Sequence, residues 1–298
     1  MLKFATALPL GIYLTSGSLP RLPINITLFR LLPLAIFCSF LFKFIITGFI
    51  IQIMKWLYTI WMWLVLGLST IFWGTLYLLF FPIDRGGFFY YQCSRFWAKG
   101  IVKMSGVRVD VTGLEKIPME PSVFMANHQS YFDVLCLIAY LPRPVRFVAK
   151  HILKYIPILG QWMWLTGHII IERENPKQAF SALDKAAEKI RKGTSVLVFP
   201  EGTRSPDHKL GDFKKGGFVL ALKAGVPIVP VSITGTQSMM PKGKYSFTRS
   251  KGVRIKIGEP IPTQDFSLEK KQELMQKVKT AMIAGFDPDS EEAKANQN

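Results

Sequence analysis

The feature that most restricts how this chain can fold is a long apolar stretch near its N-terminus. Residues 56–83 contain no charged side chain, and the preceding run, residues 31–54, contains Lys43 as its only charge. A helix crosses a bilayer with roughly 20 apolar residues, so the second run alone is long enough. The sequence therefore predicts that residues 31–83 are embedded in a membrane, as a helical hairpin or as an anchor.

The residues before this stretch are less informative. Residues 1–30 combine Lys3 with a short apolar run and have no small-residue cleavage site, which is a poor match to a signal peptide. We expect a poorly defined N-terminal extension over residues 1–30. Met54, followed by Lys55, also resembles a start ahead of a membrane anchor, so Met1 and Met54 both stay open as the start of the protein.

After Asp84 the composition becomes that of a soluble domain, in which short apolar runs alternate with helical patterns. This alternation predicts an α/β fold, with a mainly parallel, mixed sheet flanked by helices, over residues 84–286. The polar segment 287–298 is acidic at its start and is expected to be a disordered tail. The predicted strands are 107–112, 123–126, 146–150, 168–171, 195–199, 228–233 and 253–257, and the predicted helices are 132–140, 158–166, 176–192, 217–224 and 268–284.

The charge balance indicates an anionic partner. Lys and Arg outnumber Asp and Glu by 37 to 20, giving a formal net charge of +17. Nucleic acid, an anionic bilayer surface and phosphorylated small molecules all fit such a balance. No nucleic-acid-binding motif accompanies the charge. The three cysteines form no CxxC pair and predict neither a disulfide framework nor a zinc site.

Polar side chains follow several of the predicted strands directly. His128, Lys150, Arg173 and residues 201–204 each come just after a strand. In parallel sheets the carboxyl ends of the strands meet at one edge, where ligands bind. We therefore expect these residues to gather at that edge.

His128 and Asp133 are the best candidates for chemistry. Five positions apart, they would point about 140° away from each other on a regular helix. They cooperate only if His128 lies in the loop after the strand and Asp133 in the first turn of the next helix, where the carboxylate orients a general base. Ser130 is a rival nucleophile, but without a GxSxG turn an N-cap role suits it better. One His and one Asp are too few ligands for a metal.

A second group of residues suits a phosphate. Glu201, Gly202, Thr203 and Arg204 follow a buried strand and bring together a hydroxyl, a guanidinium and a glycine that permits close approach of the backbone. Arg173 lies ahead of a helix start, where free N–H groups also favour an anion. With Lys150 at a third strand end, these residues predict a pocket for an anionic substrate.

Four segments together resemble the glycerolipid acyltransferases, specifically 1-acyl-glycerol-3-phosphate acyltransferases of the PlsC type. Residues 127–133 fit the family block NHxSxxD, and residues 199–205 fit FPEGTRS. Residues 167–173 resemble GxxFIxR, with Ile170 where Phe is usual, and residues 226–231 match a proline-bearing block. The four occur in the family's order, so the resemblance is specific although each block alone is weak.

The resemblance implies a membrane-bound enzyme that uses no cofactor. His128 would deprotonate the sn-2 hydroxyl of lysophosphatidate, Asp133 would orient the imidazole, and the alkoxide would attack acyl-CoA or acyl carrier protein thioester directly. Lys150, Arg173 and residues 201–204 would hold the glycerol phosphate. The catalytic domain would face the cytoplasm, where both donors occur. Acyl transfer to glycerol-3-phosphate or another lysolipid, or a basic membrane-binding module without catalysis, are the alternatives; the oligomeric state stays open.

Overall fold

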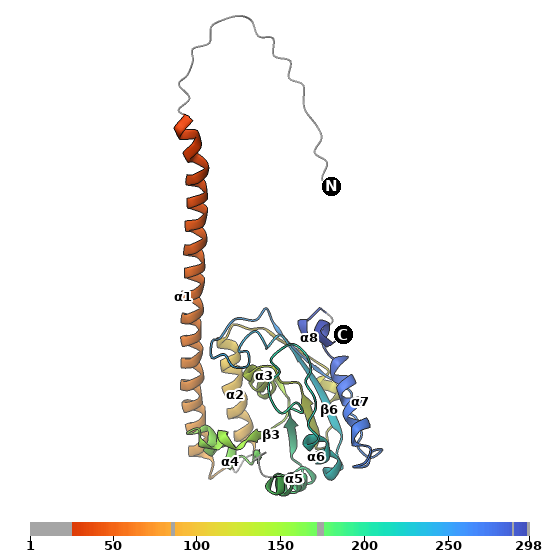
Figure 1. Cartoon of the computed structure of the whole chain (residues 1–298). Coiled ribbons are helices and arrows are strands. Elements are labelled where there is room, and N and C mark those ends of the chain that lie inside the picture. Colours follow the sequence, from red (N-terminus) through yellow and green to blue (C-terminus); the bar gives the residue numbers. More distant parts are fainter. Residues whose placement is uncertain (1–25, 85–86, 172–175, 288, 297–298) are drawn as a thin grey trace, which may run out of the picture. The chain divides into compact units, whose positions relative to one another are not determined.

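The computed structural model describes residues 26–84, 87–171, 176–287 and 289–296 (Figure 1). The chain divides into two units, residues 1–52 and 53–298. Residues 1–25 and Arg173 lie outside the described residues. The expected N-terminal extension therefore remains a prediction for the most part.

The two apolar runs belong to one helix, α1 (Ile26–Phe80). Within it, Lys43–Phe80 is the one helix among the described residues that is long and apolar enough to cross a membrane. No turn separates the runs, so the structure departs from the hairpin alternative. Both runs are helical, and the embedding of this segment in a membrane remains a prediction.

The part of α1 after Ile53 packs on the α/β domain along one side. The Tyr58 hydroxyl donates to the Ser105 carbonyl (2.9 Å), and Trp63 Nε1 donates to the Tyr245 carbonyl (3.0 Å). Many of its other apolar side chains are exposed: Leu57, Ile60, Trp61, Leu64, Leu68, Ile71 and Phe72. One side is thus fixed to the domain, and the remaining apolar surface is available to lipid.

The domain alternates strands and helices, as the sequence predicts. The strands are β1 (Val109–Thr112), β2 (Val123–Ala126), β3 (Val145–Lys150), β4 (Ile169–Ile171), β5 (Ser195–Val198), β6 (Ile228–Thr234) and β7 (Val253–Ile257). The helices are α2 (Phe88–Met104), α3 (Tyr131–Tyr140), α4 (Leu159–Leu165), α5 (Pro176–Arg191), α6 (Gly216–Ala224), α7 (Lys271–Ile283) and α8 (Glu291–Asn296), with short 3-10 helices η1 (Leu114–Lys116) and η2 (His151–Tyr155).

The strands form one sheet in the order β1-β7-β6-β2-β5-β3-β4. Every pairing is parallel except that of β6 with β7, which confirms the mainly parallel, mixed sheet. All residues of β2, β5 and β6 are buried, because helices cover both faces of the central sheet. Because β2, β3, β4, β5 and β6 run parallel to one another, their carboxyl ends lie at one edge of the sheet.

Alternate side chains of β2 enter two separate cores. Phe124 and Ala126 pack with residues of α2 and α3, whereas Val123 and Met125 pack with residues of α5, α6 and α7. Figure 1 shows α2 and α3 on one side of the sheet and α7 on the other. This two-sided cover holds the end of β2, and with it the loop that begins at Asn127, in a fixed place.

Two elements differ from the sequence predictions. α2 has no predicted counterpart, because its aromatic start at Phe88 has low helix propensity and its pattern is ambiguous. The expected disordered tail is, over Glu291–Asn296, the helix α8, in which Glu292 and Ala293 are buried. Long-range contacts, which composition does not reveal, order this part of the tail.

Candidate active site

The candidate site begins with Asn127, which fixes how the chain leaves β2. Its side-chain amide donates to the carbonyl of Ile233 (2.8 Å) and accepts from the N–H of the same residue (2.7 Å). These are the two bonds that a neighbouring strand would make with β6. Asn127 is fully buried, so both polar groups need such partners. The loop after β2 is therefore locked to β6 where His128 begins.

His128 and Asp133 lie as the sequence predicts, in the strand-end loop and in the first turn of α3. Nδ1 of His128 is 2.9 Å from Oδ2 of Asp133. A carboxylate only accepts hydrogen bonds, so Nδ1 carries the proton and Nε2 keeps its lone pair. The His128 side chain is 15% exposed and that of Asp133 is 0%. The imidazole is thus held by a buried carboxylate and is open toward solvent.

Ser130 has the N-cap role that the sequence predicts. Its hydroxyl accepts from the Phe132 N–H (3.3 Å), and Asp133 accepts from the Ser130 N–H (2.8 Å), which completes a capping box. The same hydroxyl donates to the Met240 carbonyl (3.3 Å). These bonds occupy Ser130 and leave it no part as a nucleophile.

Further donors fix the Asp133 carboxylate. Oδ2 also accepts from the backbone N–H of Gln129 (2.7 Å), and Oδ1 accepts from the Thr236 hydroxyl (2.5 Å). Thr236 was not predicted, because a single threonine in a loop carries no pattern. Its one sequence signal is its place just after the predicted strand 228–233, at the same edge of the sheet.

The ring of His128 is also held from one face. The imidazole stacks on Phe199, with ring centroids 4.0 Å apart and planes 20° from parallel. Phe199 is the residue after β5, the neighbour of β2. The Asp133 bond and this stacking together set the direction of Nε2.

Glu201 supports the loop that carries His128. Its Oε1 accepts from the His128 N–H (2.7 Å), and its Oε2 accepts from the Gly211 N–H (2.9 Å). Burial raises the pKa of the Glu201 carboxyl to about 6, against the lowering effect of these two N–H groups. Both oxygens are thus used inside the protein. The role of Glu201 in binding substrate remains a prediction.

The pKa of Glu201 leads to a testable pH dependence of stability. Because its folded value is raised, the folded protein takes up a proton between about pH 4.5 and 6 that the unfolded chain does not. We expect the protonated Glu201 carboxyl to contribute fully to the free energy of unfolding below about pH 4.5. This contribution should fall by about 2 kcal/mol as the pH rises through 6. Denaturant unfolding of wild type and Glu201→Gln across this range measures it; a constant difference between the two would contradict it.

Residues 202–204 form a turn beside this support. Gly202 has a φ of 74°, which favours glycine, and its N–H donates to the Phe199 carbonyl (3.0 Å). Thr203 is exposed. The Arg204 guanidinium lies 3.9 Å from the ring centroid of Tyr131, at the start of α3. In the described part of the chain, its buried Nη1 has no hydrogen-bond partner.

The remaining predicted site residues lie at the same edge or outside the described residues. Lys150 is the exposed last residue of β3 and pairs with Ile171, the last residue of β4. β5 separates β3 from β2. Arg173, two positions after β4, is not described. The edge placement of Lys150 is as expected, and the contribution of both residues to an anion pocket stays a prediction.

Two other histidines are explained by the structure. His168 is buried; its Nδ1 accepts from the Phe147 N–H (2.9 Å), so Nε2 carries the proton toward the Tyr90 hydroxyl (3.1 Å). Burial lowers the pKa of His168 to about 3. It is a packing residue. Nδ1 of His208 lies 3.8 Å from Oε1 of the buried Glu292.

Comparison with known proteins gives a consistent result. Residues 108–234 match the family model described as Acyltransferase. A 1-acyl-sn-glycerol-3-phosphate acyltransferase of Pseudomonas aeruginosa is 35% identical over 209 residues, which cover 67% of this chain and 79% of that protein. One of Chlamydomonas reinhardtii is 42% identical over 157 residues, 52% of this chain and 47% of the relative. The chain spans about half the length of several of these curated relatives.

A solved structure has the same fold. The 1-acyl-sn-glycerophosphate acyltransferase PlsC of Thermotoga maritima superposes with a TM-score of 0.69 at 31% sequence identity, covering 78% of this chain and 94% of that one. The sheet, the four sequence blocks and these similarities agree. The chain belongs to the PlsC-like family of glycerolipid acyltransferases.

Proposed function

We propose that the protein transfers a fatty acyl group from an acyl thioester to the sn-2 hydroxyl of 1-acyl-glycerol-3-phosphate and so forms phosphatidate. The observation that carries this proposal is the bond from His128 Nδ1 to the buried Asp133 carboxylate. It leaves Nε2 as a base beside a turn that suits phosphate. The names of the relatives support the choice of substrate.

The reaction needs no covalent enzyme intermediate. Nε2 of His128 takes the proton of the acceptor hydroxyl, and the oxygen attacks the thioester carbonyl carbon. The carbon–sulfur bond then breaks, and the imidazolium returns its proton to the leaving thiolate. Asp133 stabilises the imidazolium through Nδ1. The products are phosphatidate and a free thiol, and His128 is neutral again.

The turn at residues 202–204 would hold the phosphate of the acceptor. Arg204 supplies a guanidinium oriented by Tyr131, with a buried Nη1 that has no protein hydrogen-bond partner among the described residues. A guanidinium binds phosphate oxygens in a bidentate fork. The Thr203 hydroxyl would add a donor, and the absence of a side chain at Gly202 permits close approach of the phosphate to the turn. Lys150 and Arg173 would contribute charge from the neighbouring strand ends.

The donor and the membrane complete the proposal. Acyl-CoA and acyl carrier protein both carry phosphates, which suit the net charge of +17. The apolar segment Lys43–Phe80 would keep the domain at the membrane that holds the lysolipid. The catalytic domain would lie on the cytoplasmic face, where both donors are available.

A direct assay tests the function. The purified full-length chain is incubated with acyl-CoA or acyl carrier protein thioester and, separately, with 1-acyl-glycerol-3-phosphate or glycerol-3-phosphate. We expect phosphatidate from the first acceptor at a higher kcat/KM than product from the second. A higher kcat/KM with glycerol-3-phosphate would show that glycerol-3-phosphate is the acceptor. If no acceptor gave product, the alternative of a basic membrane-binding module without catalysis would be favoured.

Replacing Arg204 tests the phosphate site. We expect Arg204→Ala to raise the acceptor KM about 10-fold or more, because a lost charge-assisted bond costs about 1.5–3 kcal/mol, with a smaller effect on the donor KM. Arg143→Ala is the matched control, because Arg143 precedes β3 at the opposite edge of the sheet and donates to the Glu120 carbonyl. An unchanged acceptor KM in Arg204→Ala would count against a phosphate role.

A further inference from the structure

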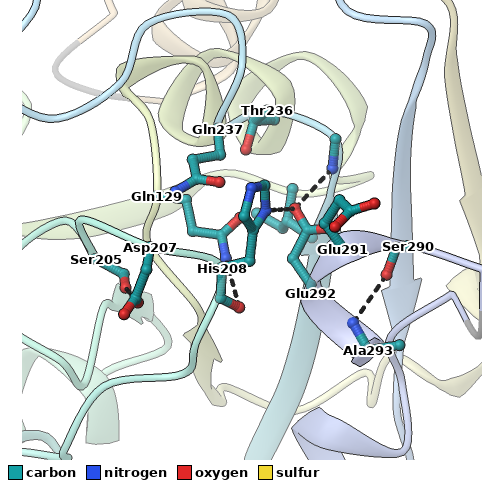
Figure 2. Close-up of polar contacts among 12 residues, drawn as sticks. Gln129, Ser205, Asp207, His208, Thr236, Gln237, Ser290, Glu291, Glu292 and Ala293 are labelled. Carbon is teal, nitrogen blue, oxygen red and sulfur yellow. Dashed lines mark hydrogen bonds and ion pairs between the residues drawn. The ribbon is translucent and has the colours of Figure 1, made fainter. Parts of the chain in front are cut away.

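The short helix α8 lies against two loops of the candidate site. Six residues are too few for a helix to be stable alone. Yet Glu292 is 2% exposed and Ala293 packs in the core that includes α7. Figure 2 shows Glu292 beside His208, with the loop of Thr236 and Gln237 above it. Contacts with the rest of the domain therefore hold α8 in place.

The first loop contains Thr236. Oε1 of Glu292 accepts from the Gly235 N–H (3.1 Å), and the next residue, Thr236, donates to Asp133. Gly235 has a φ of 86°, so the chain turns sharply there, and the Glu292 bond holds the turn. One hydrogen bond thus connects α8 to Gly235, the neighbour of Thr236, which holds Asp133.

The second loop contains Gly211. The Asn296 side chain accepts from the Leu210 N–H (2.9 Å) and donates to the His208 carbonyl (3.1 Å). It thus binds the backbone of this loop through both groups of its amide, as Asn127 binds that of β6. The next residue, Gly211, donates to Glu201, which in turn accepts from the His128 N–H. α8 is therefore also connected to the support of His128.

A carboxylate at position 292 needs an explanation beyond packing. Burying a charged group is costly unless it is paired or hydrogen-bonded, and an apolar side chain would fill the same space at less cost. Glu292 instead accepts from Gly235 and lies 3.8 Å from Nδ1 of His208. The side chain is thus placed to hold the turn at Gly235, beside His208.

We infer that α8 is a clamp for the active site, in which Glu292 and Asn296 are positioning residues for the His128–Asp133 pair. Glu292 acts through Gly235, the neighbour of Thr236, which donates to Asp133. Asn296 acts through Leu210, the neighbour of Gly211, which donates to Glu201, the residue that accepts from the His128 N–H. The inference rests on the proposed acyl transfer. It gives the C-terminal segment a part in the chemistry, although α8 provides no group that touches substrate.

The test uses the full-length enzyme and measures kcat, both KM values and melting temperature. We expect Glu292→Ala to lower kcat about 10-fold with little change in either KM, since small misplacements of reacting groups cost this much. Glu292→Gln should recover most of kcat, because its amide oxygen still accepts from Gly235. Glu291→Ala is the matched control: Glu291 is exposed, lies 3.7 Å from Lys294 and should have wild-type kcat.

A double-mutant cycle separates positioning from general stability. Thr236→Val removes the donor to Asp133, so its effect on kcat and that of Glu292→Ala should be less than additive. Asn296→Ala tests the second loop independently, and remains informative if Glu292→Ala does not fold. Three results would each overturn the clamp. They are a wild-type kcat in folded Glu292→Ala and Asn296→Ala, a kcat of Glu292→Gln no higher than that of Glu292→Ala, and strictly additive effects of Glu292→Ala and Thr236→Val on kcat. An inactive wild type would instead overturn the proposed function.

Discussion

Replacing His128 by alanine is expected to lower kcat by about 10²-fold or more, the usual range for a lost general base. The variant loses Nε2, the group that we propose removes the acceptor proton. Both KM values should change little, because His128 contributes no charge to the phosphate site. Initial rates of phosphatidate formation at saturating acceptor and donor measure the effect.

The fold of this variant is expected to persist. The His128 backbone keeps its bonds to Glu201 and to the Ser205 N–H (2.8 Å). The control is therefore the melting temperature of the variant itself, together with both KM values. A folded His128→Ala enzyme with near-normal turnover would exclude the general-base mechanism.

The second large effect is expected from Asp133→Asn, for a reason that the hydrogen bonds make specific. The Oδ2 position faces three N–H donors, from His128, Gln129 and Ser130, so the amide oxygen must take it. The new NH₂ group then faces the Thr236 hydroxyl, which can rotate and accept. The geometry and the Nδ1 proton of His128 are kept, and only the negative charge is lost.

We therefore expect Asp133→Asn to lower kcat about 10²-fold, since a hydrogen bond to a charged group is worth up to about 3 kcal/mol. KM should be nearly unchanged, and the capping of α3 should survive. Asp265→Asn makes the same chemical change at an exposed position and is the matched control. A wild-type kcat for Asp133→Asn would show that the carboxylate charge does not stabilise the imidazolium.

The sequence predicted the frame of the site well, because the frame depends on local patterns. Continuous apolar runs such as residues 123–126 indicate buried parallel strands, and ligand residues after such strands converge at one edge. The pairing of His128 with Asp133 followed from the predicted strand 123–126, the helix expected after it, and the fact that a single regular helix would set the two side chains apart. These predictions required no knowledge of which strands are neighbours.

The supports of the pair could not be predicted in the same way. Thr236 reaches Asp133 across 103 positions, and Glu201 reaches the His128 N–H across 73. Glu201 was predicted to bind substrate because it belongs to the segment 201–204 after a buried strand, and its local sequence does not reveal that both of its oxygens accept from backbone N–H groups. The polar segment 287–298 looked disordered for a related reason, since the burial of Glu292 depends on Gly235, 57 positions away.

The strand order also has a consequence for folding. In the described sheet β2 lies between β5 and β6, and both of these strands come from much later in the chain. Such non-local pairings form slowly and late, because loop-closure entropy opposes them. The reactive arrangement around His128 thus arises only when the central sheet is complete. Recovery of activity during refolding would therefore report the end of folding, not its beginning.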